Sequence, residues 1–197
     1  MASKLLGRIS AVAAACVALP LVLTGVAGAH GYTTNVPSRA YLCKTGAVTG
    51  CGPVQWEPQS VEGPKGFPAR GPGDGRICAG GLGQFAQLDD PRGGSWPARK
   101  VSSGQGLAFS WTLTAAHATT SFRYFITRNG WNPSAPLTRA ALEPAPFYTV
   151  NFNGARPGST VTHTGTLPTR SGRHLILAVW DIADTGNAFY QCGDVTF

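Results

Sequence analysis

The residue most suited to metal chemistry is His30, which follows a potential cleavage site. Residues 1–29 have the pattern of a secretory signal peptide: two basic residues, an apolar stretch, and the A-x-A sequence AGA at positions 27–29. Cleavage after Ala29 would leave His30 with a free α-amine beside its ring Nδ1, and these two nitrogens can chelate one metal ion. The α-amine has an unperturbed pKa of about 8, so a metal ion displaces its proton at modest cost. Nitrogen ligands in a planar arrangement favour copper.

A second imidazole would complete a set of three nitrogen ligands, and three histidines could supply it. His117 lies in WTLTAAHATTSFRYFIT, where a loop opens after a strand; His163 lies inside the expected strand TVTHTGTL; His174 stands at a strand start. A loop histidine after a strand is the better position for a ligand. Spacing alone leaves the choice among the three open.

The cysteines predict disulfides. Four of the five lie beyond residue 29: Cys43, Cys51, Cys78 and Cys192. An even number in an exported protein predicts two disulfides. Cys43 and Cys51 enclose a short loop containing glycine, which favours the pairs Cys43–Cys51 and Cys78–Cys192. The rival interpretation is a metal site, which the absence of a C-x-x-C motif disfavours.

Charge and hydropathy limit the partners that the chain could have. The formal net charge of the whole chain is +7, but its Lys and Arg residues are scattered and form no run, which disfavours nucleic acid. A membrane anchor at residues 9–26 is the alternative to a signal peptide; Pro20, Gly25 and the lack of stop-transfer charges disfavour it. We therefore expect a secreted, extracellular monomer without a membrane anchor, its residues 30–197 forming a single catalytic domain.

The elements that must position these residues are mostly strands. GLAFSWTLT at 106–114 alternates with period two, and so does SFRYFITR at 121–128. Four more short strands follow: FYTVNFNG, TVTHTGTL, RHLILAVWDIA and AFYQCGDVTF. This pattern predicts an all-β fold, an antiparallel β-sandwich of the immunoglobulin or fibronectin-III kind. Residues 38–100 are rich in Gly and Pro and predict a large insertion of loops with a short helix at Leu82–Leu88.

Four motifs, in this order, resemble the bacterial lytic polysaccharide monooxygenases of auxiliary activity family ten. They are HGY at the cleavage site, WEPQSVEG, WTLTAAHATTSFRYFIT and WDIADTGNAFYQCGDV. No motif alone is specific, but together they cover essentially all of residues 30–197. The resemblance implies a copper-dependent oxidoreductase in which His30 and His117 form a histidine brace around one copper ion per chain. His163 and His174 are then expected to be exposed or hydrogen-bonded to the backbone.

The resemblance also gives catalytic roles to three residues around the metal. Phe189, in NAFY, matches the residue that blocks an axial copper position. Ala115 matches the small side chain over the other axial face, and Glu62 matches the carboxylate that orients the oxygen species. Phenylalanine carries no donor atom, and a carboxyl group can accept or donate a hydrogen bond, so both roles are chemically sound. Taken alone, Phe189 would be a core residue and Glu62 an exposed loop carboxylate.

Candidates for substrate contact lie in the same motifs. Trp56 stands in the Gly/Pro-rich region, where a flat aromatic ring can stack on a sugar; many chitin-binding relatives have an aromatic residue here, often Tyr. Trp111 and Trp180, in contrast, lie on apolar strand faces and are expected in the core. The polar candidates for substrate contact are Glu57, Thr114, Asp184 and Asn187.

These features together predict a flat-faced enzyme that breaks an insoluble polysaccharide oxidatively. Copper, an external electron donor, and hydrogen peroxide or oxygen would be required. WEPQSVEG and NAFY resemble the chitin-active branch, which oxidises C1. The rivals are a non-catalytic chitin-binding module, a copper carrier without a polysaccharide substrate, and a cellulose-active monooxygenase. A glycosidase is disfavoured, because no pair of acidic residues stands in a recognised hydrolase context.

Overall fold

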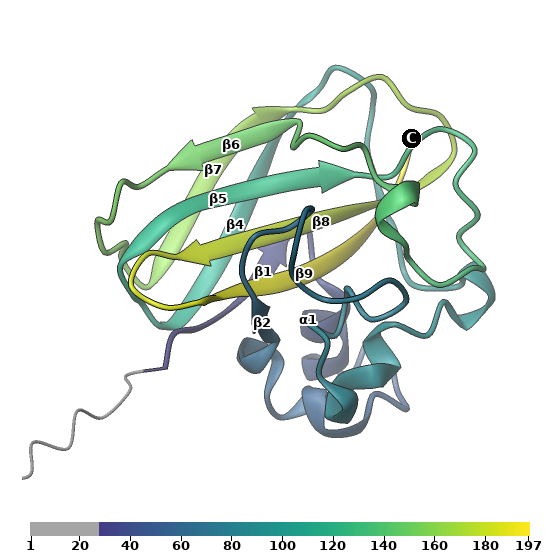
Figure 1. Cartoon of the computed structure of the whole chain (residues 1–197). Coiled ribbons are helices and arrows are strands. Elements are labelled where there is room, and N and C mark those ends of the chain that lie inside the picture. Colours follow the sequence, from purple (N-terminus) through teal and green to yellow (C-terminus); the bar gives the residue numbers. More distant parts are fainter. Residues whose placement is uncertain (1–27) are drawn as a thin grey trace, which may run out of the picture.

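The computed structural model describes residues 28–197, so most of the expected signal peptide lies outside the described residues. Within 28–197, no helix is both long and apolar enough to cross a membrane. The chain folds into two packed β-sheets, with the insertion below them in the view of Figure 1. The β-sandwich expected from the strand pattern is thus confirmed.

The smaller sheet has three strands in the order β1-β4-β7, and the larger has six, in the order β2-β9-β8-β5-β6 with β3 also paired to β9. All pairs are antiparallel except β3 with β9. The strands are β1 (His30–Asn35), β2 (Glu62–Pro64), β3 (Arg99–Lys100), β4 (Gly106–Ala115), β5 (Thr119–Ile126), β6 (Tyr148–Asn151), β7 (Thr160–Thr166), β8 (Arg173–Ile182) and β9 (Asn187–Thr196).

Strand β8 shows why the larger sheet has a nearly continuous apolar sequence. Its residues Ile176, Ala178 and Trp180 face the core between the two sheets. The alternate residues, such as Leu177 and Val179, belong to a second core against the insertion. A strand alternates its side chains between two faces, so a strand covered on both faces needs apolar residues at every position. The larger sheet is therefore the middle of three layers.

Strand β4, in contrast, is covered on one face only. Leu107, Phe109, Trp111 and Leu113 are buried in the core between the sheets, while the intervening residues are more exposed. This is the alternation that the sequence predicted for 106–114. Burying an aromatic or leucine side chain contributes on the order of 1.5–3 kcal/mol, so this face supplies much of the attraction between the sheets.

The insertion contains more short elements than the sequence predicted. The expected helix at Leu82–Leu88 is a 3₁₀ helix, η3 (Gly83–Leu88). The others are α1 (Arg39–Lys44), η1 (Gly52–Gln55), η2 (Pro58–Ser60) and η4 (Arg92–Gly94). Helix α1 begins at Ser38, whose hydroxyl accepts a hydrogen bond from the backbone N–H of Tyr41 at 3.2 Å. With only six residues, α1 depends on tertiary packing for its stability.

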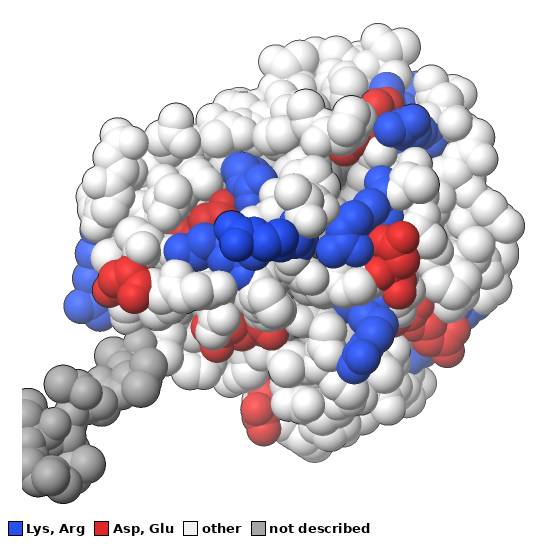
Figure 2. All heavy atoms as spheres, viewed as in Figure 1, with Lys and Arg blue, Asp and Glu red and all other residues white. Residues whose placement is uncertain are grey.

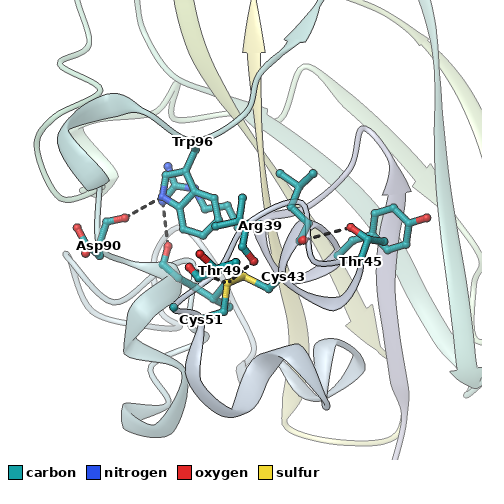
Figure 3. Close-up of a disulfide and its surroundings, with 12 residues drawn as sticks. Arg39, Cys43, Thr45, Thr49, Cys51, Asp90 and Trp96 are labelled. Carbon is teal, nitrogen blue, oxygen red and sulfur yellow. Dashed lines mark hydrogen bonds between the residues drawn. A yellow bond between two sulfur atoms is a disulfide. The ribbon is translucent and has the colours of Figure 1, made fainter.

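Two kinds of cross-link fasten the insertion. The disulfides are Cys43–Cys51 and Cys78–Cys192, as expected, and they join residues 8 and 114 positions apart. Figure 3 shows Arg39 and Trp96 beside the Cys43–Cys51 bond. Arg39 is buried; its Nε donates to Asp194 on β9 at 2.9 Å, and its guanidinium lies over the Trp96 ring at 4.8 Å. A buried, bidentate arginine of this kind fixes geometry where a lysine would not.

Some of the charged side chains form ion pairs with one another. Arg123 binds Asp181 at 2.7 Å, and Arg170 binds Glu143 at 2.6 Å. Accordingly, basic and acidic atoms lie next to each other on the face shown in Figure 2. On this face a band of basic atoms crosses the middle, with acidic atoms beside it on both sides.

Candidate metal centre and active face

The centre is built where the first strand meets the end of β4. His30 is the first residue of β1, and its Cα partner across the sheet is Ala115, the last residue of β4. His117 follows two residues later, in the short connection from β4 to β5. The register of this strand pair therefore places Ala115 opposite His30 and brings the β4–β5 connection to the same edge.

The backbone at His117 is held from the core. The hydroxyl of buried Thr119 donates to the carbonyl of His117 at 2.9 Å, and it accepts the indole N–H of Trp180 at 2.8 Å. The backbone N–H of Ala183 also donates to the carbonyl of Ala118 at 2.8 Å. Three bonds thus fix the connection to the buried strands β5 and β8.

Phe189 approaches His30 from the other sheet, where its strand partner is Glu62. Phe189, on β9, pairs with Glu62, the first residue of β2. The Phe189 ring is fully buried, and its centroid lies 6.4 Å from that of the His30 ring. An apolar ring at this position offers no donor atom to a metal ion, and it fills space that a donor atom of another residue would need.

The position of Glu62 depends on a close backbone approach. Gly63 lies against Gly80, and a Cβ on Gly63 would overlap the carbonyl oxygen of Gly80. The carbonyl of Val61, the residue before Glu62, accepts a hydrogen bond from the backbone N–H of Tyr190 at 3.0 Å. Strand β2 is therefore held between β9 and the rest of the insertion. Glu62 is half-buried in this strand, whereas its sequence context alone would suggest an exposed loop residue.

The nitrogen atoms of the two histidines fit a copper ligand set. The Nδ1 atom of His117 is buried and makes no hydrogen bond of acceptable angle, although an oxygen of Asp184 lies 2.8 Å away. A carboxylate facing one ring nitrogen leaves the other, Nε2, for a metal ion. The ring Nδ1 of His30 lies 3.1 Å from the carbonyl oxygen of Gly28, and its backbone nitrogen is in the peptide bond to Ala29. Removal of residues 28 and 29 would free both nitrogens of His30 together.

The residues predicted to contact substrate are all exposed, and one of them, Asp184, lies beside His117. Trp56 has 79% of its surface exposed, and among residues 28–197 it is the large hydrophobic residue with an exposed side chain. The exposed polar residues are Glu57, Thr114, Asp184 and Asn187. A hollow of about 280 Å³ lies beside His117 and Asp184, and Arg156 also lines it.

Arg156 is a residue of this surface that sequence reasoning missed. It lies between β6 and β7, outside all four motifs, where no pattern marks it. The backbone N–H of Thr119 donates to the carbonyl of Ala155 at 3.0 Å, which brings this loop beside the start of β5. Its proximity to the centre follows from tertiary packing alone.

The other two histidines lie in the interior. His174 is buried, and its ring nitrogens lie 3.1 and 3.2 Å from the backbone carbonyls of Thr127 and Ser171, as expected. For His163 the expectation was wrong: it is buried, and its Nδ1 lies 3.1 Å from the hydroxyl of Tyr124. Alternation along β7 turns His163 inward, and burial lowers the pKa values of both histidines.

Comparison with known proteins identifies the family. Residues 30–195 match the family described as lytic polysaccharide mono-oxygenase, cellulose-degrading, so the match begins at His30. The chain is 50% identical over 181 residues to the AA10 family lytic polysaccharide monooxygenase C of Mycosarcoma maydis, covering 90% of this chain and 55% of that protein. It is 45% identical over 193 residues to GlcNAc-binding protein A of Shewanella oneidensis, covering 98% and 40%. The chain thus spans about half the length of these relatives, or less.

Solved structures agree with this assignment. An AA10 lytic polysaccharide monooxygenase from Streptomyces lividans has 55% sequence identity and a TM-score of 0.83, over 85% of this chain and 100% of that one. A Bacillus amyloliquefaciens CBM33 protein in complex with Cu(I) has 43% identity and a TM-score of 0.77, over 85% and 99%. The chain therefore belongs to auxiliary activity family ten of the lytic polysaccharide monooxygenases.

Proposed function

We propose that the chain, once cleaved after Ala29, is a copper-dependent monooxygenase that breaks insoluble chitin and oxidises C1 of the sugar. The observation that carries this proposal is the strand register. It sets His30 opposite Ala115 and Glu62 opposite Phe189, with His117 two residues beyond Ala115. These are five residues to which the sequence motifs assigned metal-related roles.

His30, through its α-amine and Nδ1, and His117, through Nε2, would hold one copper ion per chain. When bound and reduced by an external electron donor, copper supplies one-electron chemistry with hydrogen peroxide or oxygen. The carboxylate of Asp184 lies 2.8 Å from Nδ1 of His117, on the side of the ring away from Nε2, which leaves Nε2 for the metal. Phe189 keeps further donor atoms out, and the single methyl of Ala115 leaves room for a small molecule.

Glu62 is the proton-handling residue of the proposed site. Its carboxyl group stands at the start of β2, opposite Phe189, where the clamp at Gly63 limits its movement. A carboxylate at this place can accept a proton and return it, and the protonated form can donate a hydrogen bond. The role requires a fixed position, and the backbone packing around Gly63 supplies it.

Chitin is the substrate that the surface and the relatives favour. The exposed ring of Trp56 suits stacking on a sugar, and Glu57, Thr114, Asp184 and Asn187 are exposed polar side chains that can hydrogen-bond to sugar hydroxyls. Among the relatives is a GlcNAc-binding protein A, and chitin is a polymer of that sugar. Cellulose is the second candidate, because the matching family is described as cellulose-degrading.

Secretion is part of the same proposal. Residues 1–29 have the sequence of a signal peptide, and the two disulfides fit an oxidising compartment. Because residues 28 and 29 occupy both nitrogens of His30, removal of the signal would also be the step that makes the metal site complete.

Mass spectrometry of the products tests this function. The mature chain would be incubated with β-chitin or cellulose, together with copper, ascorbate and peroxide. We expect soluble chito-oligosaccharides that end in an aldonic acid. Products from cellulose alone would favour the cellulose-active alternative. Adsorption to chitin with no oxidised product from either polymer would favour the non-catalytic binding module.

A further inference from the structure

One loop is fastened on both sides of the connection between β4 and β5, which carries the second candidate metal ligand. This loop, residues 152–159, joins β6 to β7 and lies at the end of the sandwich where residue 28 is found (Figure 1). The backbone N–H of Leu113, on β4, donates to the carbonyl of Ser159 at 2.7 Å, and that of Thr119, on β5, donates to the carbonyl of Ala155 at 3.0 Å. The loop therefore has a fixed position beside the candidate metal centre.

The sequence of this loop also restricts the backbone at Arg156. Asn153 and Gly154 form a tight turn with φ angles of 51° and 87°, which asparagine and glycine adopt more readily than other residues. Arg156 then precedes Pro157, and a residue before proline is restricted to an extended backbone. Pro157 is buried, whereas Arg156 is exposed. The loop thus presents one arginine to solvent from a backbone that has little freedom to move.

The charge of Arg156 is not neutralised within the described part of the chain. None of the ion pairs found there includes Arg156. Arg156 lines the hollow beside His117, and the acidic residue that lines the same hollow is Asp184. The carboxylate of Asp184 lies 2.8 Å from Nδ1 of His117, so its charge is directed at the imidazole. Gly28 also lines the hollow and lies beside the His30 ring, so removal of the signal peptide would open the hollow toward His30.

The proposed reaction changes the charge of the sugar next to this cation. The units of chitin carry hydroxyl and acetamido groups and are neutral. Oxidation at C1 gives a lactone, and addition of water opens the lactone to an aldonic acid, whose carboxyl group is ionised at neutral pH. A guanidinium presents parallel N–H donors that match the two oxygens of a carboxylate. A cation without an acidic partner, beside the site of oxidation, therefore distinguishes the product from the substrate.

We propose that Arg156 binds the carboxylate of the oxidised chain end and so determines how long the enzyme retains its product. The inference rests on the proposed function, which supplies the carboxylate, and it gives Arg156 a role in specificity and none in the oxidation itself. Because the loop already holds the residue in place, little ordering is needed on binding. The ion pair is open to water, so we expect it to strengthen binding by about two- to fivefold.

Nuclear magnetic resonance can compare a charged chain end with an uncharged one. The ¹⁵N-labelled mature enzyme is loaded with Cu(I), which is diamagnetic and leaves signals near the metal observable. The two probes are the aldonic acid of triacetylchitotriose and its alditol, which has the same open terminal unit without the charge. The reporters are the amide signals of Ala116, Ala118 and Gly158. We expect a dissociation constant about two- to fivefold lower for the aldonate. Equal constants would overturn the proposal.

Three variants test whether Arg156 is responsible for this preference. Arg156→Gln should abolish it, and Arg156→Lys, which keeps the charge without the planar fork, should retain part of it. Lys100→Gln is the matched control: it removes an exposed positive charge on β3, which pairs with the end of β9 far from Phe189, and it should leave the preference unchanged. In the parent, added salt should reduce the preference. A preference that persists in Arg156→Gln, or that disappears in Lys100→Gln, would contradict the role of Arg156.

Two further titrations identify what Arg156 recognises. The aldonate of cellotriose should be preferred over its alditol to the same extent, since the carboxylate is common to both polymers; a preference confined to the chitotriose pair would contradict recognition by charge. Ascorbate is the other anion that the proposed reaction brings to this face. If Arg156→Gln weakens only the binding of ascorbate, the residue serves the reductant and the proposal is wrong. None of these readouts needs turnover, so a missing oxidised product would contradict the proposed function and leave the preference measurable.

Discussion

The sandwich and the insertion position their parts of the candidate site in different ways. His30 and Ala115 face each other because β1 pairs with β4, so hydrogen-bond register places them. Trp56 and Glu62 belong to the insertion, whose short elements are fastened by the Cys78–Cys192 disulfide and by Arg39 on Asp194. The residues that would hold the metal thus depend on the sheet, whereas Trp56 and Glu62 depend also on the cross-links of the insertion. Removing the support of one region should therefore impair the function of that region and leave the function of the other intact.

The largest effect is expected from the long-range disulfide. Changing Cys78 and Cys192 together to Ser should lower the free energy of unfolding by about 5 kcal/mol, because the bond closes a loop with a separation of 114 residues. The matched control changes Cys43 and Cys51, whose separation is 8, and should cost about 2.5 kcal/mol. Urea unfolding measures both. Equal costs would mean that loop closure is not what holds the insertion.

Glu62→Gln should reduce the rate of oxidised product release by about 10²–10⁴-fold, because an amide cannot exchange a proton. Adsorption to chitin should stay nearly unchanged. Asp90→Asn is the control, since Asp90 is an exposed carboxylate of the insertion outside the candidate site. Chromatography of the products gives the rates. Full turnover by Glu62→Gln would remove the residue from the chemistry.

On the sandwich side, one extra residue before His30 should weaken copper binding by about 100-fold or more. The extra peptide bond removes the α-amine, and loss of a ligand should exceed the 10–100-fold effect typical of outer-shell changes. Isothermal titration with Cu(II) provides the measurement, and one residue added after Phe197 is the control. Tight binding with an extended N-terminus would show that the amine is not a ligand.

On the insertion side, Trp56→Ala should weaken adsorption to chitin by about 1–3 kcal/mol if the exposed ring is a stacking anchor. Copper affinity should not change, because no proposed ligand is touched. Trp56→Tyr keeps an aromatic ring and should retain most of the adsorption. Binding isotherms on insoluble chitin compare the three proteins, and equal adsorption by Trp56→Ala would end this assignment.

The smallest effect concerns the pH dependence of the insertion. Burial raises the pKa of Asp89 to about 6, although the N–H groups of Cys78 and Ala79 donate to its carboxylate at 2.8 and 3.2 Å. The folded chain then binds this proton more tightly than the unfolded chain, whose carboxyl titrates near 3.8. The free energy of unfolding should therefore fall as the pH rises from about 4 to about 6. Asp89→Asn should lack this decrease, and parallel unfolding curves of both proteins measure the difference.

The sandwich could be predicted from the sequence because its strands carry their own pattern. Leu107, Phe109 and Trp111 alternate as a half-buried strand must, and the apolar run of β8 reflects two covered faces. The insertion could not be predicted in the same way. Helix α1 has six residues and β2 has three, and both exist because of tertiary contacts such as those of Arg39 and Gly63.

The residues of the candidate site likewise differ in how far the sequence alone could predict them. His30 could be found from its place after the cleavage motif, but the choice of His117 over His163 and His174 needed the family resemblance. The structure separates them physically, since alternation and packing bury the other two. Arg156 could not be found at all, because only packing brings its loop to the start of β5.

Strand β9 carries Phe189 near its start and Cys192 three residues later. Strand β9, which would contribute Phe189 to the proposed metal centre, is therefore tied to the insertion by a disulfide that a reductant can cleave. The proposed activity requires an external electron donor, and a reductant is also the kind of reagent that can break a disulfide. Thiol exchange requires access to a sulfur atom, and both Cys78 and Cys192 are buried, with 1% and 2% of their surfaces exposed. Their burial protects the fold from the reductant that the proposed activity requires.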